Sequence, residues 1–380
     1  MSLTNSFIQA FKKPENNTRY RTFWQYIHID IPLLLTILLV TIAGLFILYS
    51  ASGQNLNIVE QQAMRIGLSL GIMVAFAQVP PIVYQRWALA LYSIGIVLLV
   101  AVLVFGHIGK GAERWLNLGI IRIQPSEIMK LAIPLFLAWH FHRIHLPLTF
   151  NAILFAAVII LIPVLLTAKE PDLSTAILLV IAGASVLFLA GISWYLIGML
   201  GALIGLCAPV IWFVLHDYQR QRVLTFFNPE HDPLGAGYHI IQSKIAIGSG
   251  GLFGKGWLNG TQSHLNFIPE RTTDFIFAVC GEEFGFFGSI ILITVFMAII
   301  LRGLYITTHA QDTFSRLLAG SLTLTIFVSF FINMGMVTGI LPVMGIPLPL
   351  ISYGGSSMVT IMASFGILMS IQTHRKLITT

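Results

Sequence analysis

The sequence predicts an all-α integral membrane protein with about ten transmembrane helices and a large extracytoplasmic loop between helices 7 and 8. Three observations lead to this fold class. Of the 380 residues, 56% are apolar or aromatic and only 9% are charged, whereas a soluble domain carries roughly a quarter charged residues. Apolar windows of about 20 residues, the length that crosses the hydrocarbon of a bilayer, recur along the chain. One long glycine-rich stretch interrupts their succession.

Ten windows are apolar enough to form membrane-spanning helices. They cover approximately residues 31–51, 63–79, 87–107, 126–142, 151–168, 173–190, 192–214, 274–303, 315–340 and 350–373. The first 25 residues are polar and basic, so we expect no cleavable signal peptide, and the first helix serves as its own insertion signal. Together the windows predict a single polytopic membrane domain over residues 1–380.

The orientation follows from basic residues in the tails and tight turns, which favour the cytoplasm. Lys12, Lys13, Arg375 and Lys376 place the N-terminus inside, and ten crossings then bring both termini to the cytoplasmic side. Eleven of the 21 Lys and Arg residues lie outside in this arrangement: Arg65, Lys110, Arg114, Arg122, Lys130, Lys169, Arg220, Arg222, Lys244, Lys255 and Arg271. A basic rim above the bilayer would attract a phosphate-bearing substrate. Solvated loop residues are the alternative interpretation.

Residues 215–273 form the predicted extracytoplasmic loop, and a loop of this length is usually functional. Apolar and polar residues are interleaved over 238–247, which predicts a short helix in the membrane interface. Six glycines between 248 and 260 predict a flexible cover that hinges over the membrane domain. Gly256 follows Lys255 where a phosphate-binding P-loop needs Ser or Thr, so no nucleotide site is expected.

The start of the fourth helix carries two charges inside an apolar window. Ser126 can cap this helix, and Glu127 and Lys130 are three residues apart, so they share one face. The pair is either a structural ion pair or a site where Lys130 binds an anionic group and Glu127 holds it in place. Ionisable groups in membrane helices mark functional sites by default.

Two aspartates lie where loops meet helices. Asp172 opens the sixth helix and is a good N-cap, which would by itself explain its presence. Asp274 ends the long loop and starts the eighth helix, where the helix dipole would stabilise a carboxylate. Small residues follow at spacings of three and four, which places them on the same helix face as Asp274: Ala278, Gly281, Gly285 and Gly288. We therefore expect Asp274 to point into the bundle at its outer mouth.

Two further features lie near this mouth. Glu282 and Glu283 are about 12 Å deeper than Asp274 along the helix. They could relay protons or be structural, and we favour a structural role. Before the last helix, residues 339–357 are apolar but too rich in proline and glycine to form a continuous helix. Such backbone at membrane depth must be buried by protein or line a cavity.

Several of these segments resemble one family. FIPERTTDFIFA over 267–278 and PLPLISYGGS over 347–356 closely resemble the SEDS family (shape, elongation, division, sporulation). The segment 281–283 and the motifs around Arg114, Glu127 and Asp172 match in the same order, so the likeness covers nearly the whole chain. GILPVMGIP over 339–347 is similar to the rod-shape branch of the family rather than its division branch.

The resemblance implies a peptidoglycan glycosyltransferase that polymerises lipid II into β-1,4 glycan strands and releases undecaprenyl diphosphate during elongation of rod-shaped cells. It implies an inner-membrane location with the active site facing the periplasm. The implied partners are lipid II, a class B penicillin-binding protein, other membrane proteins of the elongation complex and membrane lipid, with no nucleic acid. No cofactor is certain, and a divalent cation is left open.

The family's aspartate at the junction of loop and helix maps onto Asp274, the expected general base. The family's functional Glu and Lys map onto Glu127 and Lys130. The expected substrate-binding residues are Lys130, Glu127, Arg122, Arg114, Trp115, Asp172, Arg271 and Ser352. Among them, Lys130, Arg122 and Arg271 are candidates to offset the charge on the departing diphosphate.

Two other classes of protein fit part of this pattern. A flippase or proton-coupled transporter of the lipid-linked precursor would also have buried charges and broken helices, and it would use Glu282 and Glu283 centrally. A catalytically silent membrane scaffold for other wall enzymes is the third hypothesis. Purified protein supplied with labelled lipid II separates the three, because only the polymerase makes glycan chains.

Overall fold

The structure is a computed structural model of the chain. It describes residues 27–105, 107–109, 112–117, 122–144, 148–214, 220, 224–226, 228, 236–265, 267–268 and 270–374. The basic tails that set the predicted orientation, together with Lys110 and Arg222, lie outside the described residues. So do the side chains of Arg114 and Arg122, whose backbone is described.

Helices cover all ten predicted windows in the described part of the chain. They are α3 (Ile31–Ala51), α4 (Leu56–Gln78), α5 (Pro81–Phe105), α6 (Pro125–His142), α7 (Phe150–Lys169), α8 (Leu173–Leu189), α9 (Trp194–Val214), α13 (Ile276–Thr308), α14 (Thr313–Thr338) and α15 (Ser356–Thr373). Six of them are long and apolar enough to cross a membrane, judged by length and composition: α3, α5, α7, α13, α14 and α15. The total of ten crossings stays a prediction.

The described residues are predominantly helical, as expected, and three short strands add to the helices. The strands β1 (His107–Gly109), β2 (Ala112–Asn117) and β3 (Arg122–Ile123) form a small antiparallel sheet in the order β1-β2-β3 between α5 and α6. Backbone groups of a connection need hydrogen-bond partners, and these strands supply them to one another. Strands of two to six residues leave too little alternation to be recognised in the sequence.

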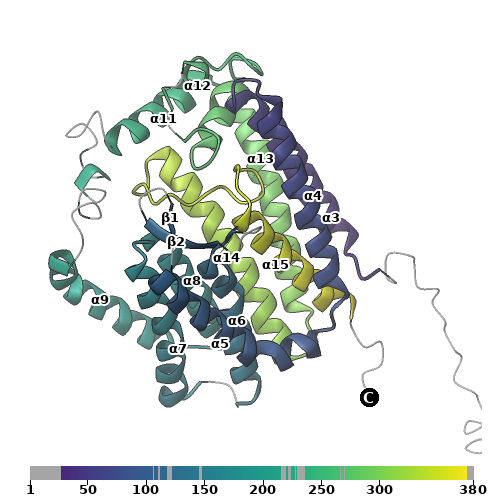
Figure 1. The fold of residues 1–380 in the computed structure, drawn as a ribbon, viewed down its shortest axis with the longest axis vertical. Helices are drawn as coiled ribbons and strands as arrows, with labels where there is room; N and C mark the ends of the chain where they lie inside the picture. Colours follow the sequence, from purple (N-terminus) through teal and green to yellow (C-terminus); the bar gives the residue numbers. More distant parts are fainter. Residues whose placement is uncertain are drawn as a thin grey trace, which may run out of the picture.

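The helices form one bundle around α13 and α14 (Figure 1). On one side, α3 packs against α13 and α4 packs against α15, while α6 and α8 pack against α14 on the other side. The helix α9 runs away from the other helices and makes few contacts with them (Figure 1). Two helices of the long loop, α11 (Ala236–Gly250) and α12 (Thr261–His264), lie over one end of the bundle.

The ends of many elements meet at that same end, which we call the Asp274 end. Here α4, α6, α8, α13 and α15 begin, and α3 and α14 finish. The helix α11 confirms the predicted helix around residues 238–247. Residues 339–355 contain no helix, as expected, and they cross this end between α14 and α15. The Asp274 end is therefore where loop residues can meet residues of the bundle.

Candidate functional site

Asp274 lies in a turn that precedes α13 instead of in its first helical turn. The helix begins at Ile276, and its N-cap residue is Phe275, which makes no side-chain capping bond. Within the turn, the backbone N–H groups of Thr273 and Phe275 both donate to the carbonyl of Glu270, at 3.0 and 3.3 Å. These bonds close a tight loop before the helix starts. The prediction that Asp274 opens the helix is wrong by two residues.

Bonds from α14 and from the segment before α15 hold this turn in place. The amide of Asn333 on α14 donates to the carbonyl of Asp274 at 2.8 Å, and also to that of Ile346 at 2.7 Å. The hydroxyl of Ser352 donates to the carbonyl of Thr273 at 2.6 Å. Ser352 was expected to bind substrate, but its hydroxyl positions the Asp274 turn. The backbone of the turn is thus fixed by elements other than α13.

The carboxylate of Asp274 lies against Gly345 and close to the start of α8. A Cβ atom at Gly345 would be 3.5 Å from Oδ2 of Asp274 and 4.0 Å from the hydroxyl of Ser174. Gly345 has a φ of +69°, which non-glycine residues rarely adopt. The hydroxyl of Ser174 donates to the carbonyl of Met344. Asp274 is partly exposed, and its neighbours Gly345 and Ser174 place it between the start of α8 and residues 339–355.

Asp172 is the N-cap of α8, as one interpretation of the sequence expected. Its carboxylate accepts from the backbone N–H of Thr175 at 3.1 Å and from the hydroxyl of Thr175 at 2.8 Å. The amide of Gln124 donates to it at 3.2 Å and thereby joins α8 to the start of α6. The residue is 2% exposed. These contacts explain Asp172 by its structural role.

The pair Glu127 and Lys130 forms the expected ion pair on α6, with Lys130 Nζ 2.6 Å from Glu127 Oε1. The pair lines a pocket with hydroxyl groups of α14 and α15 and with residues 346–349. The pocket holds about 40 Å³, which is close to the volume of one water molecule. In this conformation Lys130 therefore faces a space too small for a diphosphate.

The other predicted residues of the site are spread over two regions. The guanidinium of Arg271 donates to the carbonyl of Ser263, which ties the Asp274 turn to α12. Burial lowers the pKa of Arg271. Trp115 is partly buried in β2 opposite His107. The predicted helix cap at Ser126 is wrong, because Gln124 is the N-cap residue and proline follows it.

The glycine-rich stretch after α11 inserts into a break in α13. At Gly285 the helix adopts a φ of +66°, and the break exposes backbone groups. The N–H groups of Lys255 and Gly256 donate to the carbonyls of Glu282 and Glu283, each at 3.0 Å. In return, the carbonyls of Gly251 and Leu252 accept from the next turn of α13 at 2.9 and 3.1 Å. The glycines were predicted to form a hinge, but here they allow backbone to pack directly on backbone.

Glu282 binds the same segment with its side chain. Its Oε1 accepts from the ammonium of Lys255 at 2.8 Å, from the hydroxyl of Thr261 at 3.1 Å and from the N–H of Gln262 at 2.8 Å. Its Oε2 accepts from the N–H of Ser263 at 3.2 Å. The carboxylate is fully buried. This arrangement supports the structural interpretation of Glu282, because its lone pairs are used to hold the loop.

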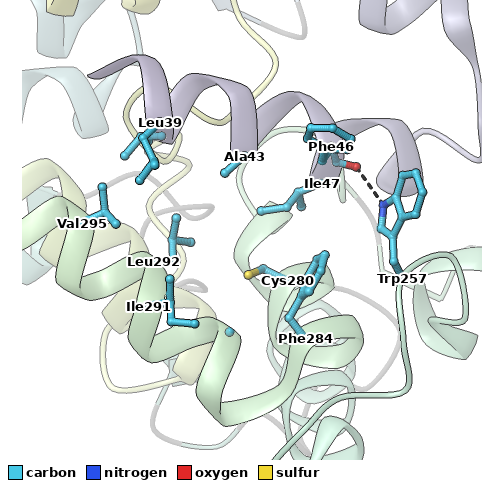
Figure 2. Close-up of a pocket in the computed structure, with 12 residues that line it drawn as sticks. Leu39, Ala43, Phe46, Ile47, Trp257, Cys280, Phe284, Ile291, Leu292 and Val295 are labelled. Atoms are coloured by element: carbon cyan, nitrogen blue, oxygen red, sulfur yellow. Dashed lines mark hydrogen bonds between the residues drawn. The ribbon is translucent and has the colours of Figure 1, made fainter. Parts of the chain in front are cut away.

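An apolar groove of about 470 Å³ lies between α3 and α13 (Figure 2). Aliphatic and aromatic side chains such as Leu39, Phe46 and Ile291 line it. Trp257 closes one end, and its indole N–H donates to the carbonyl of Phe46 at 3.2 Å (Figure 2). An apolar groove of this kind can hold hydrocarbon.

The described residues contain no group of three or more His, Cys, Asp and Glu placed to hold a metal ion. What they do contain is a polytopic helical bundle with the carboxylate of Asp274 on a rigidly held turn at its mouth. Cations and hydroxyl groups surround that end of the bundle. These features define the class of the molecule as a polytopic helical membrane protein.

The comparisons with known proteins identify which membrane protein family this is. The family model described as "Cell cycle protein", which covers FtsW, RodA and SpoVE, matches residues 30–377. The chain therefore belongs to the SEDS family. The peptidoglycan glycosyltransferase MrdB of Escherichia coli K12 is 54% identical over 364 residues, which cover 96% of this chain and 98% of the relative.

Solved structures agree with this assignment. One chain of a peptidoglycan synthase complex, described as coordinating polymerization and crosslinking, superposes with a TM-score of 0.80 at 28% identity, covering 92% of this chain and 98% of its own. The rod shape determining protein RodA of Thermus thermophilus gives a TM-score of 0.69 at 26% identity, covering 91% and 98%. With its six apolar helices, the chain is an integral inner-membrane protein.

Proposed function

We propose that this chain is a peptidoglycan glycosyltransferase that polymerises lipid II into β-1,4 glycan strands, with Asp274 as the general base. Its relatives are named as peptidoglycan glycosyltransferases at 54% identity over nearly the full chain. The observation that carries the residue assignment is the placement of Asp274. Its turn is held from α14 and from residues 339–355, so the carboxylate keeps its position at the mouth without support from α13.

The reaction requires a base and a stabilised leaving group. The acceptor hydroxyl attacks the anomeric carbon of the donor sugar and passes its proton to Asp274. The bond between that carbon and the diphosphate oxygen breaks, and its electron pair leaves with undecaprenyl diphosphate. A single displacement turns an α-linked donor into a β-linked product. General-base assistance of this kind is worth typically 10² to 10⁴-fold in rate.

The site faces the periplasm, and both termini lie in the cytoplasm. A class B penicillin-binding protein that cross-links the product is the expected partner, within a larger elongation complex. This assignment draws on the solved peptidoglycan synthase complex, one chain of which superposes on 92% of this chain. The flippase hypothesis needs Glu282 to relay protons. The carboxylate of Glu282 does not fit that role, because it already accepts four hydrogen bonds.

The test compares Asp274→Asn with Asp312→Asn in purified protein supplied with labelled lipid II. Asp312 caps α14 at the opposite end of the bundle, and asparagine is an equally good cap. Asp274→Asn should lower the polymerisation rate by at least about a hundredfold, and the control should stay near wild type. An Asp274→Asn variant that keeps more than about a tenth of the rate excludes the base assignment.

A further inference from the structure

Arg65 lies inside α4, although the sequence placed it near the outer edge of a window that starts at residue 63. The helix begins at Leu56, so Arg65 is about 13 Å along it from the Asp274 end. Its side chain is half-buried. A half-buried arginine in a helix bundle needs neighbouring groups that stabilise its charge. The sequence analysis counted this residue among the outer basic residues without giving it a role.

The described partner of Arg65 is an aromatic ring. Its guanidinium lies over Tyr353, 4.4 Å from the ring centroid. By contrast, Lys255 and Arg302 each lie within 2.8 Å of a carboxylate. No carboxylate among the described residues is within ion-pair distance of Arg65. The ring attracts the cation, but it does not neutralise the charge.

Tyr353 connects Arg65 to the Asp274 turn. Its hydroxyl donates to Gln61, one helical turn before Arg65, at 2.8 Å. Its backbone N–H donates to the carbonyl of Thr272, two residues before Asp274, at 2.9 Å. The ring is thus fixed from both sides. A cation stacked on it has a defined position relative to the reacting carboxylate.

The stacking also leaves the right donors available. A guanidinium that lies flat on a ring uses its face, so the N–H groups along its edge point outward. These form the planar fork that binds phosphate oxygens in pairs. The side chain of Arg65 lies against the segment before α15, because a Cβ atom at Gly355 would be 3.9 Å from its Cδ and Nε atoms.

The two other predicted cations with described side chains are already engaged. Lys130 is paired with Glu127 beside a pocket the size of one water molecule. Arg271 donates to the carbonyl of Ser263 and holds the loop. Among these three cations, Arg65 is the one that is neither paired with a carboxylate nor used to hold the loop.

We propose that Arg65, seated on Tyr353, binds phosphate oxygens of the lipid-linked diphosphate and positions it for the reaction at Asp274. This inference rests on the proposed function. The place of Arg65 on a bundle helix beside the Asp274 turn favours phosphate over the carboxylates of a peptide stem, because the phosphates of a lipid-linked sugar adjoin its membrane anchor while the peptide extends into water. The phosphate of a bulk anionic lipid offers the same chemistry, so the test separates the two sources.

The experiment titrates purified protein with undecaprenyl diphosphate and, separately, with phosphatidylglycerol, using native mass spectrometry in detergent. The variants are Arg65→Gln and Arg65→Lys. Arg143→Gln is the matched control, because Arg143 lies over the ring of Trp139 at 4.1 Å after the last residue of α6, at the opposite end of the bundle. Thermal unfolding of each variant reports any loss of fold. Polymerisation rates against lipid II concentration are measured in parallel.

Arg65→Gln should weaken undecaprenyl diphosphate binding roughly ten- to a hundredfold, as expected for a lost charge-assisted pair of bonds. It should raise the KM for lipid II more than it lowers kcat. Arg65→Lys should fall between wild type and Gln, and Arg143→Gln should match wild type. Unchanged binding by folded Arg65→Gln protein overturns the proposal. An equal loss of phosphatidylglycerol binding by Arg65→Gln also overturns the proposal, because Arg65 would then bind the phosphate of bulk lipid.

Failure of the proposed function gives a different result. If the wild-type protein makes no glycan from lipid II, the proposed activity fails, while the binding titration still measures Arg65. If the wild type polymerises and Arg65→Gln binds and turns over normally, only the inference about Arg65 fails.

Discussion

Replacing Glu282 by glutamine should loosen the segment from Lys255 to Ser263 without abolishing catalysis. The buried carboxylate accepts four hydrogen bonds from this segment, one of them from an ammonium group. Glutamine has the same shape but only one oxygen. Its NH₂ group would face either the N–H of Ser263 or the donors on the other side. The variant therefore leaves at least one buried donor unpaired.

The size of the effect follows from these contacts. A hydrogen bond to a charged group contributes about 1.5–3 kcal/mol, and an unsatisfied buried donor costs about 1–3 kcal/mol. The segment should lose about 3–5 kcal/mol of its opening free energy in total. Opening of a local segment controls the hydrogen exchange of its amides. The amides of Gln262 and Ser263 should therefore exchange at least about a hundredfold faster than in the wild type.

Hydrogen–deuterium exchange of the protein in lipid nanodiscs measures this directly, and a lipid II polymerisation assay runs beside it. Lys255→Gln and the double variant complete a cycle, in which the two residues should couple by about 1–3 kcal/mol. Unchanged exchange together with lost polymerisation would refute the reasoning. The carboxylate would then act in proton transfer, as the transporter hypothesis required.

Three further substitutions test other parts of the structure by thermal unfolding in detergent. Gly250→Ala puts a Cβ onto the carbonyl of Gly281 and should cost about 1–3 kcal/mol, while Gly248→Ala, which meets nothing within 4 Å, should be neutral or better; equal stability of the two would contradict the packing role. Asp172→Ala should cost about 1–2 kcal/mol through the lost cap of α8, and no loss would disprove the cap. Lys130→Met should cost about 3–5 kcal/mol by leaving a buried charge, and adding Glu127→Gln should recover most of it. A double variant as unstable as the single one would show that the ion pair does not set stability.

Helix positions and contacts between neighbouring residues could be predicted from the sequence. Apolar windows located the helices, because burial in lipid needs long apolar runs. The ion pair of Glu127 and Lys130 follows from a spacing of three on a helix, and the cap at Asp172 follows from residue type. The ion pair and the cap each depend on fewer than five consecutive residues. Local rules are enough to predict such contacts.

Contacts between distant segments could not be predicted in this way. The start of α13 depends on how Ser352 and Asn333 hold the preceding turn, and both residues are more than 50 positions away. The glycines after α11 look like a hinge in the sequence because nothing there shows that α13 breaks to receive them. Arg65 was treated as an outer residue because its window was started seven residues too late.

The apolar groove has its two walls fastened at both ends. At the Asp274 end, the hydroxyl of Ser50 on α3 donates to Glu283 on α13, and Trp257 bonds the carbonyl of Phe46 (Figure 2). At the far end, Arg302 of α13 forms a two-point ion pair with Asp30, which caps α3, at 2.6 and 3.1 Å. The two helices can therefore tilt only as a pair. A thinner or thicker bilayer changes the tilt of α3 and α13 together, while the width of the groove between them stays constant.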